Sequence, residues 1–478
     1  MIMKVDRKTK IGILTFSDGR DYIHKNLLPV NLRYQKELKI ALEATGEFEI
    51  FTGDEIINSN SKAKQEAIRL KKYGVEVTIF NYAIWSYPQF TAVAANFAPG
   101  PFLLFCNLHP SECGMVGMLA AAGTLDQLNI PYYRVWGSIK EKEVLDKVIG
   151  FIKAASSLKK LKGLTFGNFG GRALGMYTGV SNLDQWQAMF GIDIENIEQE
   201  DIKRYGQQID SKKVNNALNW LEKLVGHIYY DGKGLTKEKL KLQIRSYYGL
   251  RNIISERNLD FIGIKAQGDL TDTYVTMDVA EAFLNDPYDW DGPHEPMVAS
   301  TEADMDGALT MQIFKHLSGT PVLFADVRHY DKEDNVWYLS NSGTHATYFA
   351  GKSYDPVINL KNVTFYPEHN YYPAGGASVH HFAAPGEVTL ARLYRKNGKY
   401  RLALLPAEFI EFPRNIALEK GSIVTPEWPI AFARLKVSYE EFLTSFPCNH
   451  IHGVYGNYIE EWLIIAKLMG DIEVKLFK

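Results

Sequence analysis

The sequence predicts an α/β protein with two doubly wound α/β domains, mostly parallel in their sheets, followed by a β-rich C-terminal domain. Three observations support this prediction. Apolar runs and amphipathic segments alternate through the first 160 residues, "KGLTFGNFGG" restarts the pattern, and strand-rich segments replace it after about residue 350. Regular alternation is typical of a parallel sheet covered by helices. We therefore expect domains at residues 1–160, 161–349 and 350–478.

The first domain shows the alternation most clearly, because several predicted helices end at a glycine. The predicted strands are residues 10–16, 48–53, 75–83, 100–107 and 130–137, and the predicted helices are residues 31–46, 61–74, 113–129 and 140–160. Ligands of such sheets bind beyond the carboxyl ends of the strands.

The second domain is predicted to contain helices through residues 182–250 and then strands in "LDFIGIKAQ", "PMVAS" and "PVLFADV". "PMVAS" is short and apolar, as expected for a buried parallel strand. Thr301 and Asp304 fit a helix N-cap pair, and Gly319 is expected to end that helix. The segment from "PMVAS" to "PVLFA" is thus predicted to be one strand-helix-strand unit with parallel strands.

The third domain is predicted from "VINLKNVTFYP", "GEVTLARLYRKNGKYRLALLPAEFIEF" and "WPIAFARLKV", which are rich in β-forming residues. "RKNGKY" indicates a hairpin with Asn-Gly at its turn. A closing helix is expected in "YIEEWLIIAKLMG".

Composition narrows the class of function. Lys plus Arg is 53 and Asp plus Glu is 56, so the net charge of -3 gives no reason to expect nucleic acid or an anionic membrane as partner. Three cysteines make no disulfide framework. The longest apolar stretches are short or interrupted, and the first residues lack the apolar core of a signal peptide. We expect a cytoplasmic protein.

Two acids each follow an apolar run, Glu302 after "PMVAS" and Asp326 after "PVLFA". If the two strands are parallel neighbours, about 4.8 Å apart, both carboxylates emerge at one edge of the sheet and can share a ligand. The alternative is that Glu302 stabilises the helix dipole while Asp326 pairs with Arg328 or caps the next turn. Two acids so close to an apolar core would repel unless a cation lies between them, which favours a site.

The same segment resembles the L-fucose isomerase family, which is related to L-arabinose isomerases. The family pattern A-T-E-N-D-x-x-N-G followed by F-A-D-V-R reads here "ASTEADMDGALTMQIFKHLSGTPVLFADVRHY". Further similar segments follow the family's order along the chain: "IGILTFSDGR", "YLSNSG", "FYPEHNYYPAGGASVHH" and "CNHIHGVYGNY". The resemblance therefore covers nearly the whole sequence.

The resemblance implies a Mn²⁺-dependent aldose-ketose isomerase, with Mg²⁺ or Co²⁺ as alternative ions. It implies that Glu302 and Asp326 bind the metal and also transfer a proton between C1 and C2 of the sugar through a cis-enediol. It places the third ligand at His450, with His452 as the alternative in "NHIHG". It also implies a homo-oligomer, a trimer or hexamer. Carboxylates and an imidazole are suitable ligands for these ions.

The resemblance also implies a set of substrate contacts. These are Gln267, Asn449, Ser342, Tyr371, Trp428, Arg20 and Trp85, the last as an aromatic that enters a neighbouring subunit's site. Of the adjacent pair His380 and His381 only one can face a site, because neighbouring residues of a strand point to opposite faces, and structural roles are favoured for both.

Taken together, the residues and the resemblance predict an aldose-ketose isomerase for a pentose or a 6-deoxyhexose such as L-fucose, D-arabinose or L-arabinose. Two alternatives stay open. One is a metal-dependent epimerase of a related sugar, and the other is a sugar-binding protein without catalysis, since the first 160 residues alone fit a binding-protein-like fold.

Overall fold

The computed structural model describes residues 8–342, 345–368, 370–470 and 472–478. The chain forms two compact units, which we describe separately. The first consists of residues Met1–Lys160 and Glu460–Ile472, and the second of residues Leu161–Ile459 and Glu473–Lys478. Within the described ranges, no helix is both long and apolar enough to cross a membrane.

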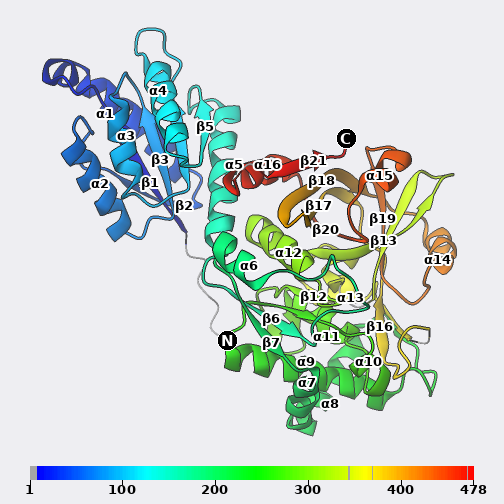
Figure 1. The fold of residues 1–478 in the computed structure, drawn as a ribbon. Coiled ribbons are helices and arrows are strands. Elements are labelled where there is room, and N and C mark those ends of the chain that lie inside the picture. Colours follow the sequence, from blue (N-terminus) through cyan, green and yellow to red (C-terminus); the bar gives the residue numbers. More distant parts are fainter. Residues whose placement is uncertain (1–7, 343–344, 369, 471) are drawn as a thin grey trace. The chain divides into compact units, whose positions relative to one another are not determined.

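The first unit contains a parallel sheet in the order β2-β1-β3-β4-β5 with helices packed against it (Figure 1). Its elements are β1 (Thr9–Phe16), α1 (Asp21–Glu43), β2 (Phe48–Thr52), α2 (Asn60–Lys72), β3 (Val77–Tyr82), α3 (Pro88–Ala95), β4 (Phe102–Cys106), α4 (Gly114–Gln127), β5 (Tyr132–Trp136), α5 (Lys142–Lys159) and α16 (Ile459–Leu468). The predicted alternation of strand and helix is confirmed. Helix α1 starts earlier than expected, since it continues through Pro29, and α3 had no predicted counterpart.

The second unit begins with a parallel sheet in the order β12-β9-β6-β7. Its elements up to residue 318 are β6 (Thr165–Phe169), α6 (Leu183–Phe190), β7 (Asp193–Ile197), α7 (Gln199–Gln207), α8 (Ser211–Leu224), β8 (His227–Ile228), α9 (Lys237–Arg257), β9 (Phe261–Ile264), α10 (Leu270–Thr273), α11 (Asp278–Asn285), β10 (Tyr288–Asp289), β11 (Gly292–Pro293), β12 (Ala299–Thr301) and α12 (Met305–Ser318). The prediction of helices throughout residues 182–250 was wrong at β7 and at the short strand β8. Strand β7 is an edge strand that is mostly polar and little buried, so it has no apolar alternation to reveal it.

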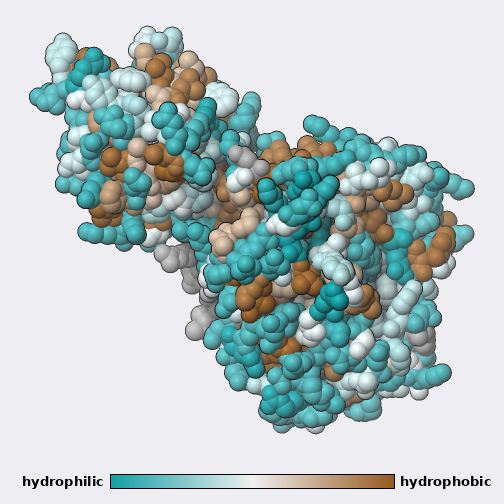
Figure 2. Space-filling view, viewed as in Figure 1, coloured by the Kyte–Doolittle hydropathy of each residue, from teal (hydrophilic) through white to brown (hydrophobic). Residues whose placement is uncertain are grey.

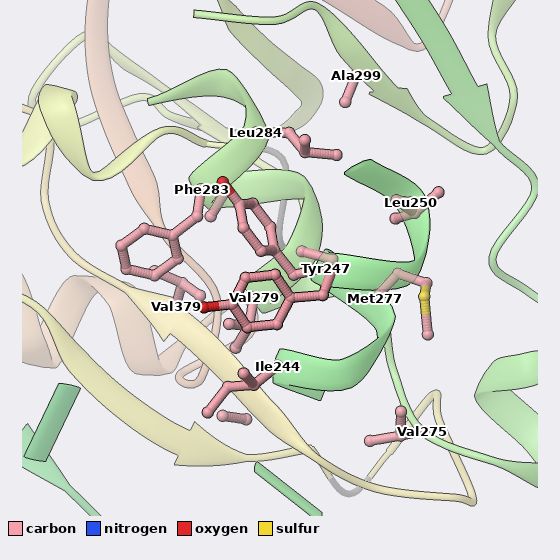
Figure 3. Packing of buried hydrophobic residues seen from close by; sticks show 14 of the residues in the cluster. Ile244, Tyr247, Leu250, Val275, Met277, Val279, Phe283, Leu284, Ala299 and Val379 are labelled. Carbon is pink, nitrogen blue, oxygen red and sulfur yellow. The ribbon is translucent and has the colours of Figure 1, made fainter. Parts of the chain in front are cut away.

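The core behind this sheet joins helices to strands that are far apart in sequence. Figure 3 shows Ile244, Tyr247 and Leu250 of α9 packed near Val279 and Phe283 of α11. The same cluster includes Ala299 of β12 and Val379 of the later strand β16 (Ala377–His380). Burial of this continuous apolar cluster fixes β12, the strand from which the first of the two acids follows.

Most of the remainder of the second unit is a β-barrel. Strands pair in the order β17-β20-β13-β14-β19-β18, and pairing of β17 with β18 closes the ring. The elements are β13 (Leu323–Asp331), β14 (Val336–Ser340), the 3-10 helix η1 (Thr347–Ala350), α13 (Pro356–Leu360), β15 (Thr364–Pro367), β17 (Gly386–Lys396), β18 (Lys399–Phe409), α14 (Arg414–Ser422), β19 (Ile430–Leu435), α15 (Tyr439–Ser445), β20 (His450–Tyr455) and β21 (Glu473–Leu476). Strands β15 and β16 lie outside the barrel and form a separate three-stranded sheet with β8. Asn397 and Gly398 both have positive φ, so the predicted hairpin turn is confirmed.

The fold class predicted from the sequence is confirmed, because two parallel α/β sheets precede a β-rich sheet. One part of the prediction was wrong. Strand β12 pairs in parallel with β9, whereas β13 pairs antiparallel with β14 and β20 in the barrel. The two strands around α12 are therefore not neighbours in one parallel sheet. Apolar spacing could not reveal this, because the barrel partner β20 lies more than a hundred residues further along the chain.

Two local predictions also needed correction. Helix α12 is capped by Asp304, whose side chain accepts a hydrogen bond from the Gly307 amide, while Thr301 ends β12 and is not part of the cap. Gly319 ends the helix with φ 68°, as predicted. Residues Pro356–Leu360, expected within a strand-rich segment, form helix α13 after an Asp355 N-cap. The barrel already begins at Leu323, and the division at residues 160 and 349 stays a prediction.

Candidate active site

Glu302 lies in a sharp turn at the carboxyl end of β12. Both Glu302 and Ala303 have left-handed backbone conformations, with φ 56° and 46°. The Ala303 amide donates a hydrogen bond of 2.8 Å to the carbonyl of Ile264, which ends the neighbouring strand β9. Non-glycine residues rarely adopt this conformation, and it is concentrated at functional sites. The strained turn brings the Glu302 carboxylate to the sheet edge, where it is 8% exposed.

Asp326 and His450 face Glu302 from the barrel. They are directly opposite each other on the antiparallel strands β13 and β20, so their side chains lie on one face. His450 Nε2 is 3.2 Å from Glu302 Oε2 and 3.5 Å from Asp326 Oδ1. The structure thus brings together the three side chains that were predicted to bind a metal.

Two asparagines hold the acids in place. Asn341, which follows β14, donates from Nδ2 to Asp326 Oδ2 at 2.9 Å and to Glu302 Oε1 at 3.4 Å. Asn449 Nδ2 donates to the other oxygen of Asp326 at 3.2 Å. Burial raises the pKa of Asp326 above its ordinary value, while the nearby His450 charge opposes that rise. Sequence reasoning missed the contact of Asn341 with the acids, although this residue lies in the family-like segment "YLSNSG".

The opposite edge of the His450 ring contacts Asp304. The distance from Nδ1 to Asp304 Oδ2 is 2.7 Å, and Arg392 of β17 approaches the same carboxylate. Burial alone lowers the pKa of His450, but the hydrogen bond with Asp304 at Nδ1 and the nearby Glu302 carboxylate raise it above its ordinary value. His452 instead accepts from Arg392 at Nε2, and burial together with that charge lowers its pKa. Of the two candidate histidines, His450 therefore faces the acids.

The donor set suits a hard divalent ion. His450 Nε2 is buried and makes no well-aligned hydrogen bond within the described chain, although two carboxylates lie within 3.5 Å. Neighbouring ligands of an octahedral ion are about 3 Å apart at metal-ligand distances near 2.1 Å. As the side chains stand, no group of three or more His, Cys, Asp or Glu among the described residues is arranged so that it could hold a metal ion. The cluster nonetheless favours a positive charge between its two acids.

A polar wall continues from Glu302. Gln267 Nε2 is 3.1 Å from Tyr372 Oη and 3.4 Å from Glu302 Oε1. Ser342 Oγ lies 2.6 Å from the same Tyr372 hydroxyl. Gln267 follows Ala266, another non-glycine residue with positive φ at the end of β9. The predicted residues Gln267 and Ser342 are thus connected to the acid pair, and Tyr372, which sequence reasoning missed, links them.

An aromatic wall is formed by Trp428 and Tyr371, whose ring centroids are 5.2 Å apart. The guanidinium of Arg328 lies 5.0 Å from the Trp428 ring and donates to the Tyr371 hydroxyl at 3.1 Å. The Trp428 indole N–H donates to buried Glu368 at 2.7 Å. Arg328 follows Asp326 by two residues on β13, so this wall adjoins the acid pair. The guanidinium of Arg328 contacts Tyr371 and Trp428, whereas the alternative prediction had paired it with Asp326.

Two predicted substrate contacts belong to the first compact unit, and the two adjacent histidines contact backbone carbonyls. Arg20 and Trp85 belong to the first compact unit, where Arg20 binds Asp18 with its guanidinium, so their predicted substrate role stays a prediction. His380 Nδ1 contacts the carbonyl of Trp428 at 2.8 Å, and His381 Nδ1 contacts the carbonyl of Val379 at 3.1 Å. Both histidines thus have backbone partners, consistent with the structural roles favoured for them.

Comparison with known proteins identifies three matching domains in the chain's own order. Residues 8–163 match the first N-terminal domain of L-fucose isomerase, residues 248–319 its second N-terminal domain, and residues 339–478 its C-terminal domain. Together these matches cover most of the chain, and they include Glu302 and His450.

Individual relatives are distant. The chain is 24% identical to an L-fucose isomerase of Klebsiella pneumoniae subsp. pneumoniae over 339 aligned positions, covering 64% of this chain and 55% of that protein. It is 22% identical to an L-fucose isomerase of Haemophilus influenzae over 546 aligned positions, covering 97% of this chain and 91% of that protein. The match to the Klebsiella protein thus spans little more than half of that protein's length.

Proposed function

Because the chain belongs to the L-fucose isomerase family, we propose that it is a divalent-metal-dependent aldose-ketose isomerase acting on a pentose or a 6-deoxyhexose. The observation that carries the proposal is that carboxylate oxygens of Glu302 and Asp326 both lie within 3.5 Å of His450 Nε2, although the three residues belong to the turn after β12, to β13 and to β20. Such a cluster is suited to an ion and to proton transfer.

Glu302, Asp326 and His450 would hold the ion, with Mn²⁺ preferred and Mg²⁺ or Co²⁺ as substitutes, because hard oxygen donors and one imidazole suit these ions. When bound, the ion supplies Lewis acidity that polarises the sugar carbonyl. The other steps belong to the protein. One carboxylate of the pair would take the proton from C2 of the open-chain aldose while the C1 oxygen gains a proton, which gives a cis-enediol. The proton would then be returned at C1 while the C2 hydroxyl loses its proton, which leaves the ketose.

The neighbouring side chains supply the hydrogen bonds that an open-chain sugar needs. In the described chain, Gln267 Oε1 and Asn341 Oδ1 are buried acceptors without a protein partner, so they can accept from sugar hydroxyls. Asn449 and Ser342 offer further polar contacts, and Trp428 with Tyr371 can pack against an apolar face of the sugar. L-fucose is the first substrate to test, given the names of the relatives, with D-arabinose and L-arabinose next.

We also propose that the protein is a cytoplasmic homo-oligomer, a trimer or hexamer. The family resemblance supports this proposal, and so does the surface of the first unit. Figure 2 shows hydrophobic residues gathered over α4. Met115, Val116 and Leu119 of that helix are each close to half exposed, which is unusual for a surface that faces only water. Light scattering coupled to size-exclusion chromatography tests the assembly, and a monomer would contradict it.

A ketose-formation assay tests the catalytic proposal. The purified protein is incubated with L-fucose, D-arabinose, L-arabinose and further aldoses in the presence of Mn²⁺, Mg²⁺ or EDTA. We expect ketose with Mn²⁺, loss of turnover with EDTA, and recovery when Mn²⁺ is returned. Turnover that EDTA leaves unchanged contradicts the metal mechanism, an epimeric aldose as product supports an epimerase, and sugar binding without turnover supports a binding protein.

A further inference from the structure

We propose that Asp304, held in place by Arg392, is a positioning residue that sets the affinity of the site for its divalent ion. Asp304 would do so through His450, by fixing the tautomer and the orientation of the ring so that Nε2 faces Glu302 and Asp326. This inference rests on the proposed function, because it concerns the same ion.

Asp304 makes three kinds of contact at once. Its carboxylate accepts the Gly307 amide at 2.9 Å as the N-cap of α12, and its Oδ2 lies 2.7 Å from His450 Nδ1. Arg392 donates to both carboxylate oxygens, Nη1 to Oδ2 at 2.5 Å and Nη2 to Oδ1 at 3.0 Å. Asp304 and Arg392 are completely buried, and His450 is 1% exposed. An N-cap alone requires none of the contacts to Arg392 or His450.

Arg392 is itself anchored, which keeps the carboxylate from rotating. Its Nη2 donates to the carbonyl of Thr178 at 2.8 Å, and its Nη1 donates to His452 Nε2 at 3.0 Å. A buried carboxylate is costly unless a paired cation and hydrogen bonds compensate it. The bidentate arginine provides both, so Asp304 stays an acceptor with a fixed direction.

The fixed acceptor determines which nitrogen of His450 is free. A carboxylate that accepts from Nδ1–H leaves Nε2 as the nitrogen available to an ion, and such partners commonly orient metal-binding histidines. The Phe324 ring packs against His450 with centroids 4.6 Å apart, which further restricts rotation of the imidazole. Arg392 lies 88 residues beyond Asp304 in the sequence. A residue of barrel strand β17 therefore holds the N-cap residue of α12 that contacts His450.

The chain provides a matched control two residues further along the same helix. Asp306 is 1% exposed, and its carboxylate binds Arg395 Nε at 3.0 Å and the Tyr400 hydroxyl at 2.7 Å. Arg395 is on β17, as Arg392 is. Asp306 is thus a buried acid of α12 paired with a β17 arginine, but its oxygens bond to Arg395 and Tyr400 instead of to His450.

Isothermal titration with MnCl₂ tests the proposal on the full-length wild type, Asp304→Asn and Asp306→Asn, together with thermal unfolding of each apo protein. We expect both variants to unfold at lower temperature. Only Asp304→Asn should weaken Mn²⁺ binding, by about 10- to 100-fold, the range seen when such a partner of a metal ligand is lost. Asp306→Asn should bind Mn²⁺ within about twofold of wild type, a margin well below that range.

Arg392→Lys provides a second variant if Asp304→Asn does not fold. Lysine keeps the charge but cannot hold both carboxylate oxygens and His452 together, so we expect weaker Mn²⁺ binding than in the wild type. Unchanged affinity in Asp304→Asn or in Arg392→Lys overturns the proposal, and so does equal weakening in Asp304→Asn and Asp306→Asn. If the wild type binds no Mn²⁺, both the role of Asp304 and the metal in the proposed function are rejected. If the wild type binds Mn²⁺ and isomerises the sugar but the variants bind as well as it does, only the role of Asp304 is rejected.

Discussion

The two acids of the candidate site stand on very different supports. Glu302 sits in a left-handed turn at the edge of the parallel sheet, whereas Asp326 lies inside a barrel strand and is paired directly across from His450. The first support is strained and local, and the second is a regular hydrogen-bonded ladder. In the proposed mechanism, the barrel would fix the position of the ion and the turn would direct one carboxylate toward it.

The same two regions also handle buried charge differently. Near the parallel sheet, Asp286 is buried among hydroxyl and amide donors, and accepts from Thr347 Oγ1 at 2.6 Å and the Tyr348 amide at 2.8 Å. In the barrel, Asp331 forms an ion pair with Lys420, whose Nζ lies 2.8 Å from Asp331 Oδ2. Burial raises the pKa of Asp286 to about 7, and the hydrogen bond from Lys420 lowers the pKa of Asp331 to about 2. The two acids should therefore respond to pH in opposite directions.

The largest expected effect is on catalysis at the strained turn. Glu302→Gln should lower isomerase turnover by about 10²- to 10⁴-fold, because the amide cannot take or return a proton. Steady-state assays with Mn²⁺ measure the change. Glu281→Gln is the matched control. Glu281 is also buried, 1% exposed against 8% for Glu302, and burial raises its pKa, so this variant should keep most activity. Full activity in Glu302→Gln would remove this acid from the mechanism.

The next effect is the pH dependence of Asp286. Its folded pKa of about 7 exceeds the ordinary value of 3.8, so its contribution to stability is complete below pH 3.8 and is lost as pH rises through 7. A difference of about 3 in pKa corresponds to about 4 kcal/mol. The stability advantage of wild type over Asp286→Asn should therefore shrink between pH 5 and pH 8. Denaturant titrations at both values measure it, and a constant difference would contradict the raised pKa.

A pair of alanines compares the two supports directly. Ala303 follows Glu302 with positive φ, and Ala325 precedes Asp326 in the barrel strand. Ala325→Gly should cost about 1 to 2 kcal/mol through loss of a buried methyl and added chain entropy. Ala303→Gly loses the same methyl but relieves a conformation that costs alanine roughly 1 kcal/mol. Thermal unfolding should place Ala303→Gly a few degrees above Ala325→Gly, and equal melting temperatures would argue against strain at the turn.

The smallest effect is expected at the rim of the barrel. Asp331 has its pKa lowered below 3.8, so its stabilising contribution is present above that pH and is lost as pH falls through about 2. Lys420→Met should lower the free energy of unfolding at pH 7 by about 1 kcal/mol, discounted for solvent because both side chains are partly exposed. At pH 2 the difference from wild type should nearly vanish. A difference that persists at pH 2 would mean that packing of the lysine stem dominates.

Local features of the fold could be read from the sequence with good accuracy. The strands and helices of the first unit, the Asn397-Gly398 hairpin and the Gly319 helix end follow from apolar periodicity and turn chemistry, which depend on neighbouring residues. Strand β7 was missed because it is a polar edge strand, and Thr301 was assigned to a cap that Asp304 forms alone. In the site, Glu302, Asp326 and His450 were predicted through the family resemblance, but the bridging of the two acids by Asn341 and the link through Tyr372 were not.

The sequence by itself determined most of the elements, the fold class and the residue types able to hold an ion. The tertiary structure alone decided how the acids meet. Asp326 lies opposite His450, 124 residues later, on the neighbouring barrel strand, and not beside Glu302 in one parallel sheet. It also decided that His450 faces the acids, since Arg392 holds His452 by hydrogen bonding to its Nε2. The spacing of apolar residues along the sequence reflects which face of a helix or strand is buried. Which strands pair at long range depends instead on closure of the barrel and on the pairing of buried charges.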